Sequence, residues 1–251
     1  MRLVELSRSE HRELRIRADQ VEACAANQHL IPIVVGEFRK AATQYPIVFA
    51  KHPDTGRFAA YVLSGLSLEE NLFWSGTELD VAYVPLNVRR QPFCVGTDDA
   101  PDASAANVLC VDLDHPCLDS PGSDSSVTRT IVNAEGSDTA YLKEILAILG
   151  ELVAGKPATE KFIAALLSLE LLAPIVLDIV LDDATPLQLQ GLYGLDEERF
   201  RQLGIAEITQ LWTAGYLDLI YAVMIASGRI FNLIRLKNQR IALSRAWQGQ
   251  Q

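Results

Sequence analysis

Two apolar segments of the chain carry the pattern of β-hairpins. In the first, the runs 47–50 and 58–63 flank the turn sequence His52-Pro-Asp-Thr-Gly56, where proline fixes φ and the aspartate and glycine tolerate a chain reversal. In the second, the runs 174–181 and 187–192 flank Asp182-Asp-Ala-Thr185. Because β-branched and aromatic runs suit buried strands, both segments are predicted to be antiparallel hairpins that could share one sheet.

The two hairpins have similar surroundings. Each follows a helical stretch, and each leads into an acidic segment that ends on a phenylalanine, Phe73 in the first case and Phe200 in the second. A duplicated helix–hairpin unit would explain the similarity. Coincidence between two generic hairpins is the alternative.

Helical periodicity accounts for most of the remaining apolar positions. Helices are predicted over residues 37–44, 141–152, 160–172, 196–203, 205–213, 217–227 and 230–247. The motif Gly155-Lys-Pro157 is expected to end the second of them, with Thr159 capping the third. In the last helix the basic side chains are expected to face outward. Since helices and strands do not alternate regularly, an α+β fold is favoured over a parallel sheet.

Composition supports one domain over residues 1–251. Hydrophobic residues make up 49% and charged residues 22% of the 251 residues, so the chain can bury a sizeable core. The segment 97–138 is loop-rich and acidic, with nine acids and the single base Arg129, and it could divide the chain into two halves. A strand is predicted at 107–113, and residues 98–106 and 119–126 are expected to be mobile loops.

Charge and hydropathy exclude several classes of protein. The net charge of −10 would repel a polyanion, so nucleic-acid binding is not expected. The charged N-terminus has no apolar core of a signal peptide. The longest apolar run, 162–181, is interrupted by Glu170, Pro174 and Asp178, which argues against a membrane span. Four cysteines without a CxxC pair suit reduced thiols, and a cytoplasmic location is expected.

Two arginines form the predicted binding site for a ligand or partner. Arg89 and Arg90 lie between Pro85 and Pro92, with Tyr83 and Phe93 nearby. Guanidinium groups fixed among aromatic side chains could bind a carboxylate or phosphate bidentately. The alternative is that both arginines form salt bridges to the acidic middle.

A metal site is conceivable where the predicted strand in the acidic middle ends. Asp112 and Asp114 would project to one face of a strand, and His115 would add an imidazole. A solvated strand end is the alternative. Neither G-x-S-x-G nor a glycine-rich phosphate loop occurs, so no catalytic residue and no cofactor are assigned.

Three stretches together resemble the SapC family, which is named for a surface-array (S-layer) accessory protein of bacteria. The stretches are Tyr45-Pro-Ile-Val-Phe with Gly65-Leu and Glu70-Asn-Leu-Phe73, then Tyr83-Val-Pro with Arg89-Arg-Gln-Pro-Phe93, and finally Gly191-Leu-Tyr-Gly-Leu-Asp-Glu-Glu through Tyr216-Leu-Asp-Leu-Ile-Tyr-Ala to Leu236-Lys-Asn. The resemblance implies a link to export or assembly of a surface-layer protein. It implies no catalytic residues, and relatives often occur beside flavin-dependent halogenase-like and TonB-receptor genes.

The resulting expectation is a non-enzymatic cytoplasmic accessory protein that binds a polypeptide, related to a surface layer or an outer-membrane receptor, through Arg89 and Arg90 and the helices after the second hairpin. The rival hypothesis is a metal- or cofactor-dependent modifying enzyme centred on Asp112, Asp114 and His115, or a partner of a halogenase-like enzyme. A third hypothesis is a homo-oligomer, such as a homodimer, joined by the acidic middle and the basic C-terminal helix.

Overall fold

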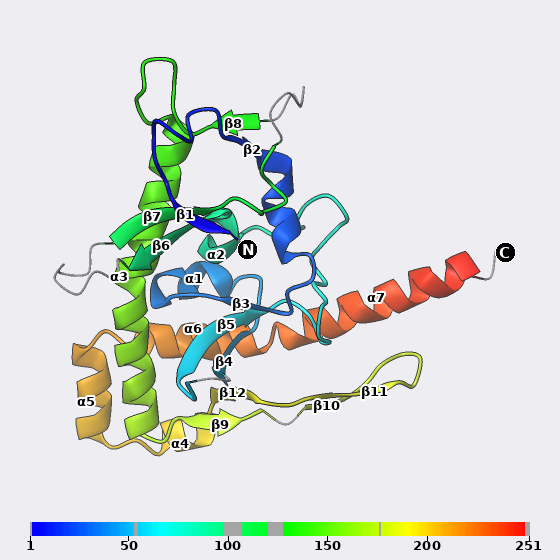
Figure 1. Ribbon diagram of the computed structural model, residues 1–251. Coiled ribbons are helices and arrows are strands. Elements are labelled where there is room, and N and C mark those ends of the chain that lie inside the picture. Colours follow the sequence, from blue (N-terminus) through cyan, green and yellow to red (C-terminus); the bar gives the residue numbers. More distant parts are fainter. Residues whose placement is uncertain (1, 53–54, 98–106, 120–127, 176, 249–251) are drawn as a thin grey trace.

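The computed structural model describes residues 2–52, 55–97, 107–119, 128–175 and 177–248 (Figure 1). It is an α+β fold in which all strand pairs of the described residues are antiparallel. The predicted mobile loops at 98–106 and 119–126 lie outside these residues, apart from Asp119. Two hydrophobic cores are present, and they are joined by one long helix.

The larger core is built on a five-stranded sheet. The strand order is β3 (Leu30–Pro32), β5 (Phe58–Leu63), β4 (Ile47–Lys51), β12 (Leu192–Leu195) and β9 (Leu172–Pro174). β4 and β5 are the first predicted hairpin, and β9 and β12 belong to the second. The possibility that the two hairpins share one sheet is borne out at the inner end of the second hairpin, because β4 pairs directly with β12, whereas the rest of the second hairpin forms a separate two-stranded sheet.

The helices that precede the two hairpins differ greatly in length. The first hairpin follows the short turn η3 (Val35–Glu37) and the four-residue α1 (Phe38–Ala41), whereas the second follows the 29-residue α3 (Ala140–Ser168). The similarity between the two units is therefore confined to the hairpins and their place in the sheet.

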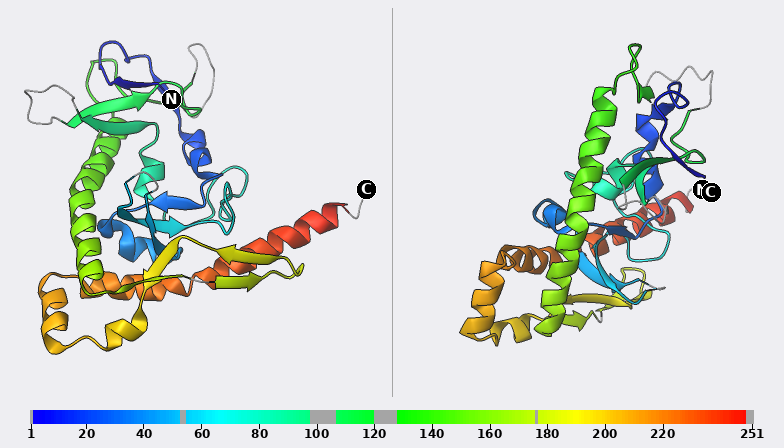
Figure 2. Two further views of the ribbon diagram at one scale, coloured as in Figure 1. Left: turned by 60° about the horizontal axis from the view of Figure 1, so that its bottom comes forward. Right: turned by 60° about the vertical axis from the view of Figure 1, so that its left-hand side comes forward.

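The second hairpin is bent by a β-bulge. Its outer half consists of β10 (Leu177–Val180) and β11 (Pro186–Leu189). Leu177 is opposite Leu189, but Pro174 is opposite Tyr193, so the returning strand contains one extra residue. Gly191 lies within that interval with φ +76°, a conformation that disfavours any side chain. The outer half consequently leaves the sheet and runs beside α7 (Ile230–Gln248) (Figure 2).

We expect Gly191→Ala to lower the free energy of unfolding by about 1 kcal/mol, because alanine is strained at a positive φ. Urea denaturation would measure the change. Gly150→Ala is the matched control: Gly150 lies within α3, and a Cβ there would meet no atom within 4 Å. This control should raise stability by up to about 1 kcal/mol. Equal effects of the two substitutions would contradict the assignment of the bulge to Gly191.

The second core lies between α3 and two small sheets. One sheet has the order β1 (Leu3–Glu5), β7 (Asn107–Asp112), β6 (Phe93–Thr97), and the other pairs β2 (Arg15–Arg17) with β8 (Thr128–Thr130). The predicted strand at 107–113 is thus present as β7. The start of the chain pairs with the described part of the acidic middle, so that middle contributes to a core shared with the N-terminus.

A single helix, α3, replaces the two helices predicted over 141–152 and 160–172. Gly155 and Pro157 do not end it. A Cβ on Gly155 would lie 2.6 Å from Cγ2 of Val34, so the glycine allows the segment before α1 to approach the helix closely. Thr159 is inside the helix, where its hydroxyl donates to the Gly155 carbonyl and accepts from the Val35 N–H. Burial of one side of α3 in both cores outweighs the local cost of proline.

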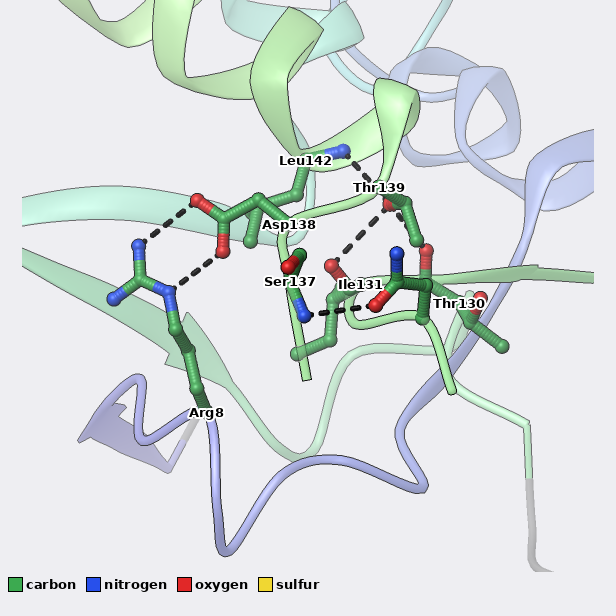
Figure 3. A network of polar contacts seen from close by, with 8 residues as sticks. Arg8, Thr130, Ile131, Ser137, Asp138, Thr139 and Leu142 are labelled. Carbon is green, nitrogen blue, oxygen red and sulfur yellow. Dashed lines mark hydrogen bonds and ion pairs between the residues drawn. The ribbon is translucent and has the colours of Figure 1, made fainter. Parts of the chain in front are cut away.

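The N-terminus of α3 is held by a polar network (Figure 3). Thr139 is the N-cap: its Oγ1 accepts from the Leu142 N–H at 3.3 Å and donates to the Thr130 carbonyl at 2.7 Å. Arg8 forms a bidentate ion pair with Asp138, at 2.6 and 3.0 Å. The hydrogen bond and charge of Arg8 lower the pKa of Asp138. The network ties both the N-terminal segment and β8 to the start of the helix.

The C-terminal helices agree closely with the prediction. They are α4 (Glu197–Arg201), α5 (Ile205–Thr213), α6 (Leu217–Ser227) and α7. The prediction that the basic side chains of the last helix all face outward is wrong for two of them. Lys237 pairs with Glu70 at 2.6 Å, and Arg240 donates to the carbonyls of Asn71 and Trp74. These contacts fix α7 against the loop that follows the first hairpin.

Candidate functional site

The segment that holds the predicted arginine pair is a short helix, α2 (Leu86–Arg89), which starts directly after Pro85. Leu86 and Val88 are buried, which fixes the helix between the two cores. The chain then enters β6 at Phe93, whose side chain is fully buried against Tyr141 with ring centroids 6.4 Å apart. Phe93 is therefore a core residue and does not face a ligand.

The side chain of Arg90 holds two segments of the fold together. Its Nε donates to Oδ1 of Asn87 at 2.9 Å, and its Nη1 donates to the Phe93 carbonyl at 2.6 Å. Burial of the guanidinium lowers the pKa of Arg90. These two bonds join α2 to β6, so the guanidinium of Arg90 has its partners inside the protein and does not face a ligand.

Tyr83 likewise has an internal partner. Its hydroxyl donates to Oε1 of Glu37 at 2.9 Å, and burial together with the charge of Glu37 raises the pKa of Tyr83. Glu37 itself is 1% exposed and also accepts from the N–H groups of Leu86, at 2.8 Å, and Val34, at 2.9 Å. One buried carboxylate thus holds the segment before α1 and the start of α2.

Arg89 is the member of the predicted set that faces solvent. It pairs with Glu144 of α3 at 2.8 Å, and its side chain is 40% exposed. The pair lies at a small hollow of about 150 Å³ that is also lined by Arg129, Tyr141 and Glu22. The guanidinium of Arg129 lies over the Tyr141 ring, 5.3 Å from its centroid. The structure therefore brings Arg89 together with Arg129 rather than with Arg90.

Sequence reasoning missed this second arginine. The sequence does single out Arg129 in one respect, because it is the one basic residue among the acids of the middle segment. Two guanidinium groups and an aromatic ring suit the recognition of a carboxylate. Since Glu144 already pairs with Arg89, an incoming carboxylate would have to displace an exposed ion pair, and such pairs contribute little stability.

The predicted metal ligands have other partners in this structure. Oδ1 of Asp112 accepts from the N–H groups of Arg2 and Asp114, at 2.8 and 3.1 Å. Nδ1 of His115 lies 3.0 Å from Sγ of Cys117 and accepts a hydrogen bond from the backbone N–H of Cys117 at 3.2 Å. Among the described residues, no group of three or more His, Cys, Asp or Glu side chains is arranged to hold a metal ion. The metal hypothesis stays a prediction that the geometry does not strengthen.

A second candidate surface surrounds the β-bulge. Three hollows of about 280, 430 and 570 Å³ meet there and share Leu189 and Leu192 in their walls. The hollow of about 430 Å³ is lined almost entirely by apolar residues, most of them from β4, β12 and the junction of α6 and α7. Phe231 is one of these lining residues, and 73% of its surface is exposed.

Exposed apolar side chains are concentrated on the same helices. Half of the large hydrophobic residues that are exposed in the described part of the chain lie on α5, α6 and α7, namely Ile205, Trp212, Tyr221, Ile225, Phe231 and Leu243. One helical stretch, Leu217–Ala246, is long and apolar enough to cross a membrane, although core helices of other proteins meet the same two criteria. What the structure adds is that much of this apolar surface has no partner within the described chain.

Comparison with protein families decides the relationship. The family model described as SapC matches residues 6–233, which include both cores, the arginine hollow and the bulge. The chain belongs to the SapC family. No curated protein and no solved structure matches it. For this SapC-family chain the assignment of a role therefore depends on its own surfaces.

Proposed function

We propose that this SapC-family protein is a non-enzymatic accessory protein that binds a polypeptide partner. The observation that carries the proposal is the unpaired apolar surface of α5–α7, which adjoins the hollows around the bulge. Exposed apolar surface of this kind marks interaction sites in proteins. Tyrosine, tryptophan and phenylalanine, which it contains, are enriched in the anchors of protein interfaces.

The proposal assigns different tasks to the two surfaces. The α5–α7 surface and the apolar hollows supply contact area for apolar side chains of the partner. Arg89 and Arg129 bind a carboxylate of the partner and so contribute orientation and association rate. The resemblance to a surface-array accessory protein supports a partner connected with export or assembly of a surface-layer protein, met in the cytoplasm.

Capture from a lysate of the native host tests the proposal, with the bound proteins identified by mass spectrometry. Phe231→Ser should lower the amount of the captured polypeptide by about tenfold, as expected for the loss of an interface anchor worth about 1.4 kcal/mol. Val153→Ser is the matched control, because Val153 is an exposed apolar residue of α3, at 39%. Equal capture by Phe231→Ser and the unaltered protein would refute the role of the α5–α7 surface.

Charge reversal tests the arginine hollow separately. Arg89→Glu is expected to lower capture several-fold and to make it less sensitive to salt, because it removes an attractive charge from the proposed carboxylate site. Arg57→Glu, in the exposed turn of the first hairpin, is the control of equal charge change. A reduction of the same size in both variants would show that net charge, rather than the hollow, governs binding.

A further inference from the structure

Two of the four cysteines face each other across adjacent strands. Cys94 of β6 is directly opposite Cys110 of β7 in the antiparallel register. Residues in such a pair project to the same face of the sheet. The preceding pair, Phe93 and Val111, is fully buried against the second core. The two cysteines therefore lie on the outer face, where both are half-buried.

The backbone spacing at this pair suits a disulfide bond. The Asp112 N–H donates to the Pro92 carbonyl at 3.1 Å, which makes these two residues a hydrogen-bonded pair. Because hydrogen-bonded and non-hydrogen-bonded pairs alternate, Cys94 and Cys110 also form a hydrogen-bonded pair, for which the Cα atoms are about 5.5 Å apart. Disulfides span Cα distances of about 4.4–6.8 Å. The Cβ atoms must approach slightly, so the bond is expected to be strained and readily reduced.

The position of the Cys110 thiol depends on a neighbouring glycine. A Cβ on Gly96 would lie 3.0 Å from Sγ of Cys110, and the same sulfur lies 3.7 Å from the Val108 carbonyl. The reduced thiol thus occupies the space above Gly96. Rotation about its Cα–Cβ bond moves the sulfur toward Cys94 without a change in strand pairing.

We propose that Cys94 and Cys110 form a site of reversible covalent modification, at which a low-molecular-weight disulfide such as oxidised glutathione converts the two thiols into a cross-strand disulfide. One cysteine thiolate attacks a sulfur of oxidised glutathione, forms a mixed disulfide and releases one glutathione thiolate. The second cysteine thiolate then attacks the protein-bound sulfur and releases the other. The protein loses two electrons and two protons, and oxidised glutathione gains them to become two molecules of reduced glutathione.

The other two cysteines lack this arrangement. Neither Cys24 nor Cys117 lies in a strand opposite another cysteine. Burial raises the pKa of Cys24 to about 11 and that of Cys117 to about 12, which keeps both as unreactive thiols at neutral pH. Burial and the nearby Cys110 also raise the pKa of Cys94, an effect that Arg90 opposes. Cys94 and Cys110 differ from the other two cysteines in their strand register, which places each thiol opposite the other.

The test equilibrates the full chain with mixtures of reduced and oxidised glutathione, then quenches with acid, alkylates the free thiols and maps the peptides by mass spectrometry. The expected result is a loss of two of the four thiols and one cross-linked peptide pair that contains Cys94 and Cys110. The bond should disappear as the proportion of reduced glutathione rises. Four free thiols in excess oxidised glutathione, or a mixed disulfide that is never resolved, would overturn the proposal.

Substitutions separate this pair from any other. Cys94→Ser and Cys110→Ser should each abolish the cross-link, whereas Cys24→Ser and Cys117→Ser should leave it unchanged. Circular dichroism would establish that each variant is folded. Gly96→Ala should increase the cross-linked fraction at a given glutathione ratio, because its methyl group displaces the Cys110 sulfur from its reduced position. A cross-link that depends on Cys24 or Cys117 would refute the assignment.

Discussion

Replacement of Phe162 by alanine is expected to lower the free energy of unfolding by about 4 kcal/mol, within the usual range for a fully buried phenylalanine. The side chain is 0% exposed and is packed edge-on or tilted against three other rings. Its centroid lies 5.8 Å from that of Phe38, 6.5 Å from Phe49 and 5.3 Å from Tyr216. One ring thus connects α3 with α1, β4 and the start of α6.

Urea denaturation followed by circular dichroism would measure this loss. Leu167→Ala is the matched control on the same helix, since Leu167 is 45% exposed and its truncation should cost less than about 1 kcal/mol. A loss at Phe162 as small as that at Leu167 would mean that the four rings do not form the centre of the larger core.

Glu37→Ala is expected to lower the free energy of unfolding by about 3 kcal/mol. Three donors that now bond the carboxylate would lose their acceptor: the Tyr83 hydroxyl and the N–H groups of Leu86 and Val34. Buried donors without a partner cost about 1–3 kcal/mol each, and partial access of water reduces the sum. The same substitution should loosen α2 and therefore the position of Arg89. Amide hydrogen exchange at Leu86 and Val88 would detect this.

Stability should also depend on pH through this carboxyl group. Burial raises the pKa of Glu37, and the hydrogen bonds from Leu86, Val34 and Tyr83 oppose the rise without cancelling it. The folded protein therefore binds the proton more tightly than the unfolded chain does. This stabilisation is complete below the unfolded pKa of about 4.3 and is lost as the pH rises through the higher pKa of the folded state.

Glu37→Gln isolates the contribution of this titration, because glutamine keeps the shape of the side chain but binds no proton in this range. As the pH rises from about 4, the unfolding free energy of the unaltered protein should fall relative to that of Glu37→Gln. A difference that is constant between pH 4 and 7 would contradict the raised pKa of Glu37.

Local patterns predicted the two hairpins, β7 and the α-helices other than α2, but they did not predict β1, β2, β3, β6 or β8. Turn chemistry at His52–Gly56 and at 182–185 identified both hairpins, and the helices predicted from periodicity over 205–213, 217–227 and 230–247 match α5, α6 and α7. The family resemblance is confirmed by the match over residues 6–233. These features depend on residues close together in the sequence, whose conformational preferences are strong enough to survive in the folded chain.

The errors have a tertiary cause. Gly155 and Pro157 carry a local signal to end a helix, but Val34, far away in sequence, needs the glycine for close packing. The candidate site shows the same limitation. Neighbouring arginines suggested one paired site, yet α2 turns Arg90 toward β6 and leaves Arg89 beside Arg129. No local pattern encodes that β8 brings Arg129 to this place.

The continuous helix α3 has a consequence for how the molecule opens. At about 1.5 Å per residue its 29 residues span about 44 Å, and its buried positions run from Leu142 in one core to Leu166 in the other. Between Leu149 and Thr159, however, no residue of the helix is buried. The central turns are therefore held less firmly than the two ends, so their amides should exchange by local opening, whereas amides at each end should exchange only when the core that covers that end opens.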